Sequence, residues 1–361
     1  MASTKRFARP SAFIRFATLA YGSIVAFASL YPLSVWRTPA SALMWNRLIE
    51  WPRYYSWPDV FLNIVAYAPL GLLFAVGLRV RLLPVPAATV AVLAATLISV
   101  VLELLQSWVP VRVPSALDVF CNAVGSLLGA WFALVAGEAW LLDGAVAQWR
   151  YRRLLPGART DAALTLLALW LFGQLGATLW LFAGGDLRGM IPLRPDPVVY
   201  SPLGQMLIEA CVTTMSMLTV TAIIGSITGE RAAVLLAGVI GCALLLKSIA
   251  GIWLYDPGHP LVWVRSGAVL GLGIGGLLAL PLLRAAAPVR ASIGLACLLG
   301  GVALLNLAPD SVYLGEGMRT WHHGHYWSFK GTTALVSLTW PLLAAIFLVA
   351  VRQSTAWRQE P

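Results

Sequence analysis

Charged side chains are scarce in this sequence. Asp, Glu, Lys and Arg make up 11% of its 361 residues and hydrophobic residues 59%, whereas soluble domains are about 25% charged. A bilayer core about 30 Å thick needs about 20 apolar residues per helical span, and such stretches recur along the whole chain. The composition therefore excludes a soluble fold and predicts an all-α, polytopic transmembrane bundle of ten spans, near residues 13–33, 59–78, 85–108, 116–137, 162–184, 202–226, 232–255, 262–283, 289–308 and 332–351.

Cysteine and histidine are also rare, with four residues of each. The cysteines form no CxxC pair and all fall within predicted spans, so neither a disulfide framework nor a zinc site is indicated; they are Cys121, Cys211, Cys242 and Cys297. His322, His323 and His325 share the loop 309–331 with aromatic residues, but such short spacing on a loop is weak evidence for zinc. We predict no metal site and no cofactor, and interpret the aromatic residues as interfacial anchors.

The basic N-terminal segment is followed by a long apolar run without a small-residue cleavage site, so we expect the first helix to be a retained anchor. With ten spans, both termini lie on one side of the membrane. That side carries 15 Lys and Arg residues against nine on the other, so the positive-inside rule predicts cytoplasmic termini. Anchoring against anionic lipid explains the net charge of +10, which makes the bilayer the expected partner and requires no nucleic acid.

A basic segment divides the chain. We predict a four-helix unit at 1–138, a basic cytoplasmic linker at 139–161, a degenerate second four-helix unit at 162–284, and two C-terminal spans with the outer loop at 285–361. The second unit repeats the spacing of the first, since 40 residues separate Asn63 from Glu103 and 38 separate Glu209 from Lys247. Because each unit has an even number of spans, two copies would be parallel.

Four residues of the first unit are assigned structural roles. Gly125 and Gly129 are four residues apart, a spacing that lets membrane helices approach closely. Pro69 removes a backbone donor and is expected to kink its helix. With Gly71 it could open room for polar side chains nearby.

Polar residues gather at the ends of three predicted helices. They form three same-face pairs, Asp59 with Asn63, Glu103 with Gln106, and Asp118 with Asn122. Arg112 lies in the short loop that follows the second pair. Under the predicted orientation all seven residues converge at the outer surface. Ionisable groups are costly within a bilayer and often mark function, so these seven are our candidate ligand-binding residues.

Two interpretations of this cluster stay open. Arg112 offers a rigid fork of donors to a carboxylate or phosphate, which could belong to the protein or to a ligand. In the structural interpretation, Asp59 and Asp118 are helix caps and Glu103 forms an ion pair with Arg112. Caps alone do not require the second polar residue of each pair, which favours a functional role.

The motif Asp59-x3-Asn63, with Pro69 and Gly71, followed by Glu103-x2-Gln106-x5-Arg112-x5-Asp118-x3-Asn122-x2-Gly125-x3-Gly129, closely resembles the VanZ-like membrane proteins. The resemblance spans about 55–138. It implies a protein of the bacterial cytoplasmic membrane in a family whose namesake is linked to low-level teicoplanin resistance, without an agreed biochemical activity.

The leading hypothesis is a module that binds a polar cell-envelope component, such as a peptidoglycan precursor, a polysaccharide or a lipid headgroup. The alternative is an intramembrane enzyme for a lipid-linked substrate, with Glu103 or Asp118 as general acid or base and Arg112 stabilising negative charge. Ser107 and Ser115 have no neighbouring histidine base, so no catalytic residue is assigned. A transporter is a third hypothesis, disfavoured because the polar residues lie at the outer mouth.

The motif decays in the second unit. Gln205 and Glu209 take the places of Asp59 and Asn63, and Lys247 takes that of Glu103. A buried ion pair is the simplest way to tolerate opposite charges in neighbouring spans. We therefore predict a structural contact between Glu209 and Lys247, with head groups within about 6 Å.

Overall fold

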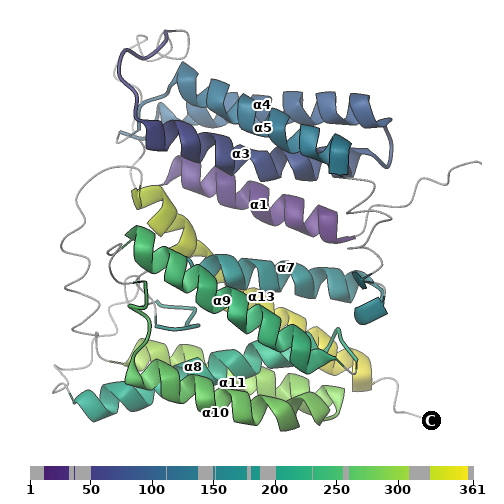
Figure 1. Cartoon of the computed structure of the whole chain (residues 1–361), viewed down its shortest axis with the longest axis vertical. Helices are drawn as coiled ribbons and strands as arrows, with labels where there is room; N and C mark the ends of the chain where they lie inside the picture. The colour runs from purple at the N-terminus through teal and green to yellow at the C-terminus, as the bar shows by residue number, and fades with distance from the viewer. Residues whose placement is uncertain are drawn as a thin grey trace, which may run out of the picture. The chain divides into compact units, whose positions relative to one another are not determined.

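The computed structural model describes residues 12–31, 36, 50–110, 112–136, 149–150, 152–176, 180–187, 201–229, 231–254, 260–308 and 326–356. Within these ranges the chain forms ten long helices and no β-strand (Figure 1). The helices are α1 (Ala12–Leu30), α3 (Trp57–Leu78), α4 (Pro84–Gln106), α5 (Ala116–Ala136), α7 (Ala158–Gly173), α8 (Pro202–Gly225), α9 (Ala232–Leu254), α10 (Ser266–Arg284), α11 (Ala287–Leu307) and α13 (Tyr326–Ala356).

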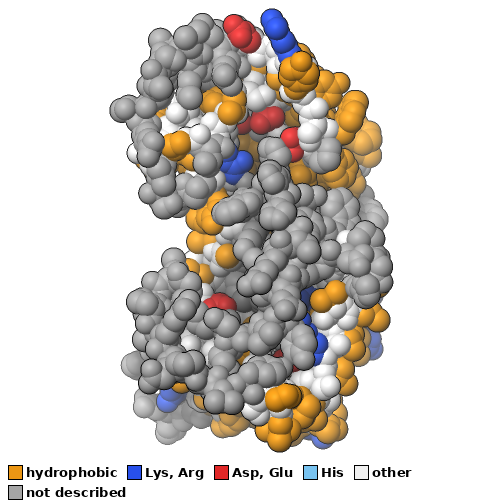
Figure 2. Space-filling view, turned by 90° about the vertical axis from the view of Figure 1, so that its left-hand side faces the viewer, with side chains coloured by type: hydrophobic (Ala, Val, Ile, Leu, Met, Phe, Trp, Pro, Cys, Tyr) orange, Lys and Arg blue, Asp and Glu red, His pale blue; other side chains and the backbone are white. Residues whose placement is uncertain are grey.

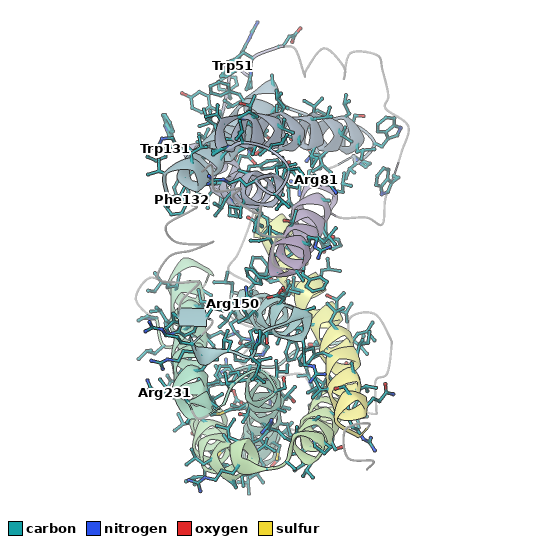
Figure 3. All side chains as sticks on the ribbon, turned by 90° about the vertical axis from the view of Figure 1, so that its right-hand side faces the viewer. Trp51, Arg81, Trp131, Phe132, Arg150 and Arg231 are labelled. Carbon is teal, nitrogen blue, oxygen red and sulfur yellow. The ribbon has the colours of Figure 1, made fainter. Side chains whose placement is uncertain are left out.

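The predicted all-α polytopic bundle is confirmed. Nine helices of the described ranges, all except α7, are long and apolar enough to cross a membrane. Their outer faces carry large apolar side chains, as Figure 2 shows for one side of the molecule. On α5, for example, Trp131 and Phe132 are 58% and 48% exposed (Figure 3). An exposed apolar surface of this extent is the lipid-facing surface of a multi-pass membrane protein.

The fifth predicted span, 162–184, was wrong as a continuous helix. The helix α7 begins earlier, at Ala158, and ends at Gly173, and Trp180–Leu187 is not helical. Glycine is a poor helix former, and Gly185 adopts a left-handed backbone with φ of 85°. Phe182 is also left-handed, with φ of 63°, although its side chain is only 1% exposed.

Neighbouring helices satisfy the backbone of this non-helical segment. Asn306 of α11 accepts from Leu187 N at 2.6 Å and donates to Gly185 O at 2.7 Å. Gly185 N donates to Ser337 O of α13 at 2.7 Å. Irregular backbone at membrane depth is tolerated only where protein groups replace the missing helical hydrogen bonds. Asn306 therefore takes over part of the role of the missing helical turn.

We expect Asn306→Ala to lower the free energy of unfolding by about 2 kcal/mol, because it leaves the buried Gly185 O and the partly buried Leu187 N without these hydrogen bonds. Equilibrium unfolding of the purified protein in mixed micelles of rising SDS fraction measures the change. Thr339→Ala is the matched control, since the exposed Thr339 hydroxyl bonds only carbonyls of its own helix. Equal stability of the two variants would contradict this role.

The helices belong to two compact units. The N-terminal unit comprises Met1–Arg152 with His325–Thr332, and the second comprises Arg153–Gly324 with Thr333–Pro361. In the N-terminal unit α3 packs on α5, α4 and α1; in the second unit α8 packs on α10 and α11. The finer division into a linker, a second four-helix unit and a C-terminal pair stays a prediction.

Glycines lie where α3 and α5 approach most closely. A β-carbon at Gly125 would collide with Ile64 O, and one at Gly129 would collide with Ala68 O. A β-carbon at Gly71 would collide with the backbone of Ser126. Both contacts of α5 advance in the same direction along the two helices, so α3 and α5 run parallel, with backbone against backbone.

The second unit contains a crossing of the same register. A β-carbon at Gly271 of α10 would lie 2.6 Å from Ala210 O of α8. Gly271 follows Ala210 by 61 residues, the same separation as Gly125 from Ile64. The helices α7, α8, α9 and α10 also follow α1, α3, α4 and α5 at a nearly constant interval. A duplicated unit requires such a shared register, although the duplication itself stays a prediction.

Candidate functional site

Three helix ends position the polar residues of the N-terminal unit. The helix α3 begins after Ser56, whose hydroxyl caps it by accepting from Asp59 N at 3.4 Å. The interpretation of Asp59 as the cap was therefore wrong by one turn. Because α3 and α5 run parallel, the start of α3 and the start of α5, which carries Asp118, lie at the same end of the unit.

Glu103 is the central acidic residue. Its side chain is 4% exposed, and its Oε2 atom accepts a hydrogen bond from Ser115 N at 3.0 Å. Asp118 and Arg112 both lie near enough to act electrostatically on its carboxyl group. The structure thus brings together one residue from α4, one from α5 and one from the loop between them.

Arg112 binds the C-terminal end of α1. Its Nε donates to Tyr31 O at 3.2 Å, and its Nη2 donates to Ala28 O and Tyr31 O, each at 3.2 Å. The last carbonyls of a helix lack helical partners and form the negative end of its dipole, so a guanidinium satisfies both needs. Burial lowers the pKa of Arg112, while the carboxylates Glu103 and Asp118 oppose that shift.

Gln106 has a related role. Its Nε2 donates to Ser29 O at 3.0 Å, so α4 and the loop after it together hold three carbonyls of the α1 terminus. Backbone carbonyls leave no mark in the sequence, which is why α1 was absent from the predicted cluster. Gln106 and Arg112 flank the end of α4. This pair of hydrogen-bond donors is the sequence signal that could have indicated a contact with α1.

Asn122 lies on α5 one helical turn after Asp118. Its side chain is 4% exposed, and its Nδ2 donates to Ser99 Oγ of α4 at 2.8 Å. Within the described part of the chain its Oδ1 is buried without a hydrogen-bond partner, an arrangement that costs about 1–3 kcal/mol. Ser99 was not among the predicted residues, although it precedes Glu103 by four positions and so shares its helix face.

Residues 10–137 match the VanZ/LLP1 family. This part of the chain is similar to that family, and we call it the VanZ-like unit. The match confirms the predicted resemblance and covers α1, α3, α4 and α5 with all seven candidate residues. The comparisons with curated proteins and with solved structures gave no match.

Asp59 and Asn63 occupy the first two turns of α3 in the VanZ-like unit, where both are partly exposed. Their engagement with the other candidate residues stays a prediction. Pro69 and Gly71 lie further along α3, where Gly71 contacts α5 beyond the polar end.

Outside the VanZ-like unit, Lys247 of α9 is 7% exposed and its Nζ donates to Gly176 O at 2.6 Å, just beyond the end of α7. Glu209 of α8 is 6% exposed and lies against Gly267 of α10. The predicted contact between Glu209 and Lys247 stays a prediction. Lys247 resembles Arg112 in its role, because each cation binds a carbonyl at the end of the first helix of its unit.

His322, His323 and His325 of the predicted outer loop 309–331 lie outside the described residues. The last part of that loop, 326–331, was wrongly predicted, because it is helical and belongs to α13. Within the described ranges, no group of three or more His, Cys, Asp and Glu side chains is placed to hold a metal ion.

Proposed function

We propose that the VanZ-like unit binds a polar cell-envelope component, such as a peptidoglycan precursor, a polysaccharide or a lipid headgroup. The observation that carries this proposal is the cluster of Glu103, Arg112 and Asp118, contributed by two helices and their connecting loop. Carboxylates held at a helix end within a membrane unit can accept hydrogen bonds from ligand hydroxyl or amino groups. The unpaired Oδ1 of Asn122 adds a buried acceptor one turn below them.

The internal bonds of Arg112 change its part in this proposal. A guanidinium that binds Ala28 O and Tyr31 O orients the loop that carries it. Arg112 then acts mainly as a positioning residue, and the carboxylates Glu103 and Asp118 are the groups that contact the ligand.

We further propose that this cluster faces outward in a bacterial cytoplasmic membrane, with both termini in the cytoplasm. Both termini lie on the same side only if the chain crosses the membrane an even number of times. The second unit supports a membrane crossing by the segment that includes α7, in addition to the nine long apolar helices. Leu155 N, before α7, donates to Ile227 O, after the end of α8, at 2.8 Å. The start of α7 thus lies beside the C-terminal end of α8. Because α8 itself spans the membrane, the chain must cross the membrane between the start of α7 and the start of α8.

A thermal-shift screen of the purified protein against envelope precursors tests the function, because a ligand that binds only the folded state raises its apparent stability. We expect a shift in wild type and at least about tenfold weaker apparent affinity in Glu103→Gln and Asp118→Asn, since each loses a charged acceptor. Glu50→Gln, which neutralises an exposed acidic residue, is the matched control. Unchanged affinity in both site variants would refute the proposal.

A cellular readout connects this site to resistance. Expression of wild type in a susceptible bacterium should raise the minimum inhibitory concentration of teicoplanin, and Glu103→Gln at equal membrane abundance should not. Equal protection by the two proteins would separate the cluster from any resistance phenotype.

A further inference from the structure

A second polar cluster lies where α8 and α10 begin, in the second unit. Gln205 and Glu209 are four residues apart on one face of α8, and Arg265 directly precedes α10. The side chains of Gln205 and Glu209 are only 9% and 6% exposed. Buried polar groups of this kind are costly in a membrane span unless they bind something.

Gln205 supplies the observation that points to a ligand. Its Oε1 is buried and has no hydrogen-bond partner among the described residues. An amide oxygen can only accept, so a group that satisfies it must donate a proton. The Glu209 carboxylate, one turn further along the same face, favours a donor that is also positively charged.

The start of α10 supplies the complementary half. The residue before this 19-residue helix is Arg265, and no described side chain caps the free N–H groups of the first turn. Uncapped N–H groups at the positive end of a helix dipole favour an anion. Arg265 lies near enough to act electrostatically on both Glu209 and Lys247.

The two halves adjoin because Gly267 has no side chain. A β-carbon there would lie 2.6 Å from Met206 O and 2.8 Å from Glu209 Oε2. The first turn of α10 therefore rests against the Glu209 carboxylate. Groups that bind an anion and groups that accept hydrogen bonds therefore lie in one small region.

We propose that this region binds the headgroup of phosphatidylethanolamine. The phosphate contacts Arg265 and the first N–H groups of α10, and the primary ammonium donates to Gln205 Oε1 and Glu209. Both α8 residues lie within about 11 Å of the start of the helix, at 1.5 Å rise per residue, so the site lies at one end of this span and not at its middle. The proposal concerns the second unit and stands apart from the function proposed for the VanZ-like unit.

Melting of the full-length protein in detergent, titrated with defined lipids, tests this assignment. We expect phosphatidylethanolamine to raise the melting temperature saturably. Phosphatidylcholine should act at least about tenfold more weakly, since its trimethylammonium group cannot donate a hydrogen bond. Phosphatidylglycerol, which lacks the ammonium, should also be weaker. A response to free phosphoethanolamine would support the same site with a soluble ligand.

Variants separate the site from general lipid effects. Arg265→Gln and Gln205→Met should each weaken the response to phosphatidylethanolamine, and Gln205→Met covers the case that Arg265→Gln fails to fold. Arg284→Gln, at the opposite end of α10, is the matched control. Equal responses to all three lipids, an equal response to inorganic phosphate alone, or loss of the response in Glu103→Gln but not in Arg265→Gln would overturn the proposal.

Discussion

Gly129→Ala is expected to lower the free energy of unfolding of the VanZ-like unit by about 3 kcal/mol or more, the upper range for overpacking a tight core. The added β-carbon would collide with Ala68 O of α3. A backbone carbonyl within a helix cannot swing away as a side chain does, so α3 and α5 must move apart. Unfolding in mixed micelles of rising SDS fraction measures this loss.

Gly77→Ala is the matched control for that change. Its β-carbon would lie 3.5 Å from Ile14 Cγ2, an ordinary van der Waals contact. Alanine is also the better helix former by about 1 kcal/mol. Gly77→Ala should therefore leave stability unchanged or raise it, and a Gly129→Ala variant as stable as Gly77→Ala would show that α3 and α5 have room to separate.

The sequence predicted most of the fold because the bilayer imposes a length on every span. The bounds of α3, α8 and α9 differ from the predicted spans by only a few residues. The break after α7 could not be predicted in the same way. The stretch 162–184 is apolar apart from Thr165, Gln174 and Thr178. What ends the helix includes the partners that Asn306 and Ser337 offer from distant helices.

The candidate cluster, too, was predictable from the sequence only in part. Helical spacing placed Glu103 and Asp118 at one end of the unit, where the structure has them within electrostatic range of each other and of Arg112. The sequence could not predict that Gln106 and Arg112 bind α1, because their acceptors are backbone carbonyls. The orphan acceptor of Asn122 was equally hidden, since it depends on how the α4 and α5 side chains pair.

In both units a cationic side chain binds backbone carbonyls at the end of the first helix, but the cation differs. In each, the first helix ends with carbonyls that need donors, supplied by Arg112 and Gln106 in the VanZ-like unit and by Lys247 in the second unit. This comparison explains why Lys247 is buried although the motif around Glu103 has no counterpart there. It also makes the role of Arg112 testable by exchange of the two cations.

Arg112→Ala should lower the free energy of unfolding by about 3 kcal/mol. Hydrogen bonds from charged groups contribute about 1.5–3 kcal/mol each, and the partial exposure of Arg112 reduces the sum of its three bonds to α1. Arg112→Lys should restore about half of that loss, because an ammonium can bind one such carbonyl as Lys247 binds Gly176 O. Unfolding in SDS mixed micelles measures both variants.

Arg81→Ala provides the control for losing a cation, because Arg81 is an exposed residue of the turn after α3 (Figure 3). Its free energy of unfolding should stay within about 0.5 kcal/mol of wild type, as is usual for surface changes. If Arg112→Ala were as stable as Arg81→Ala but no longer bound an envelope ligand, Arg112 would be a ligand contact. Loss of stability with partial rescue by lysine would instead make it the residue that fixes α1 and the loop beside Glu103.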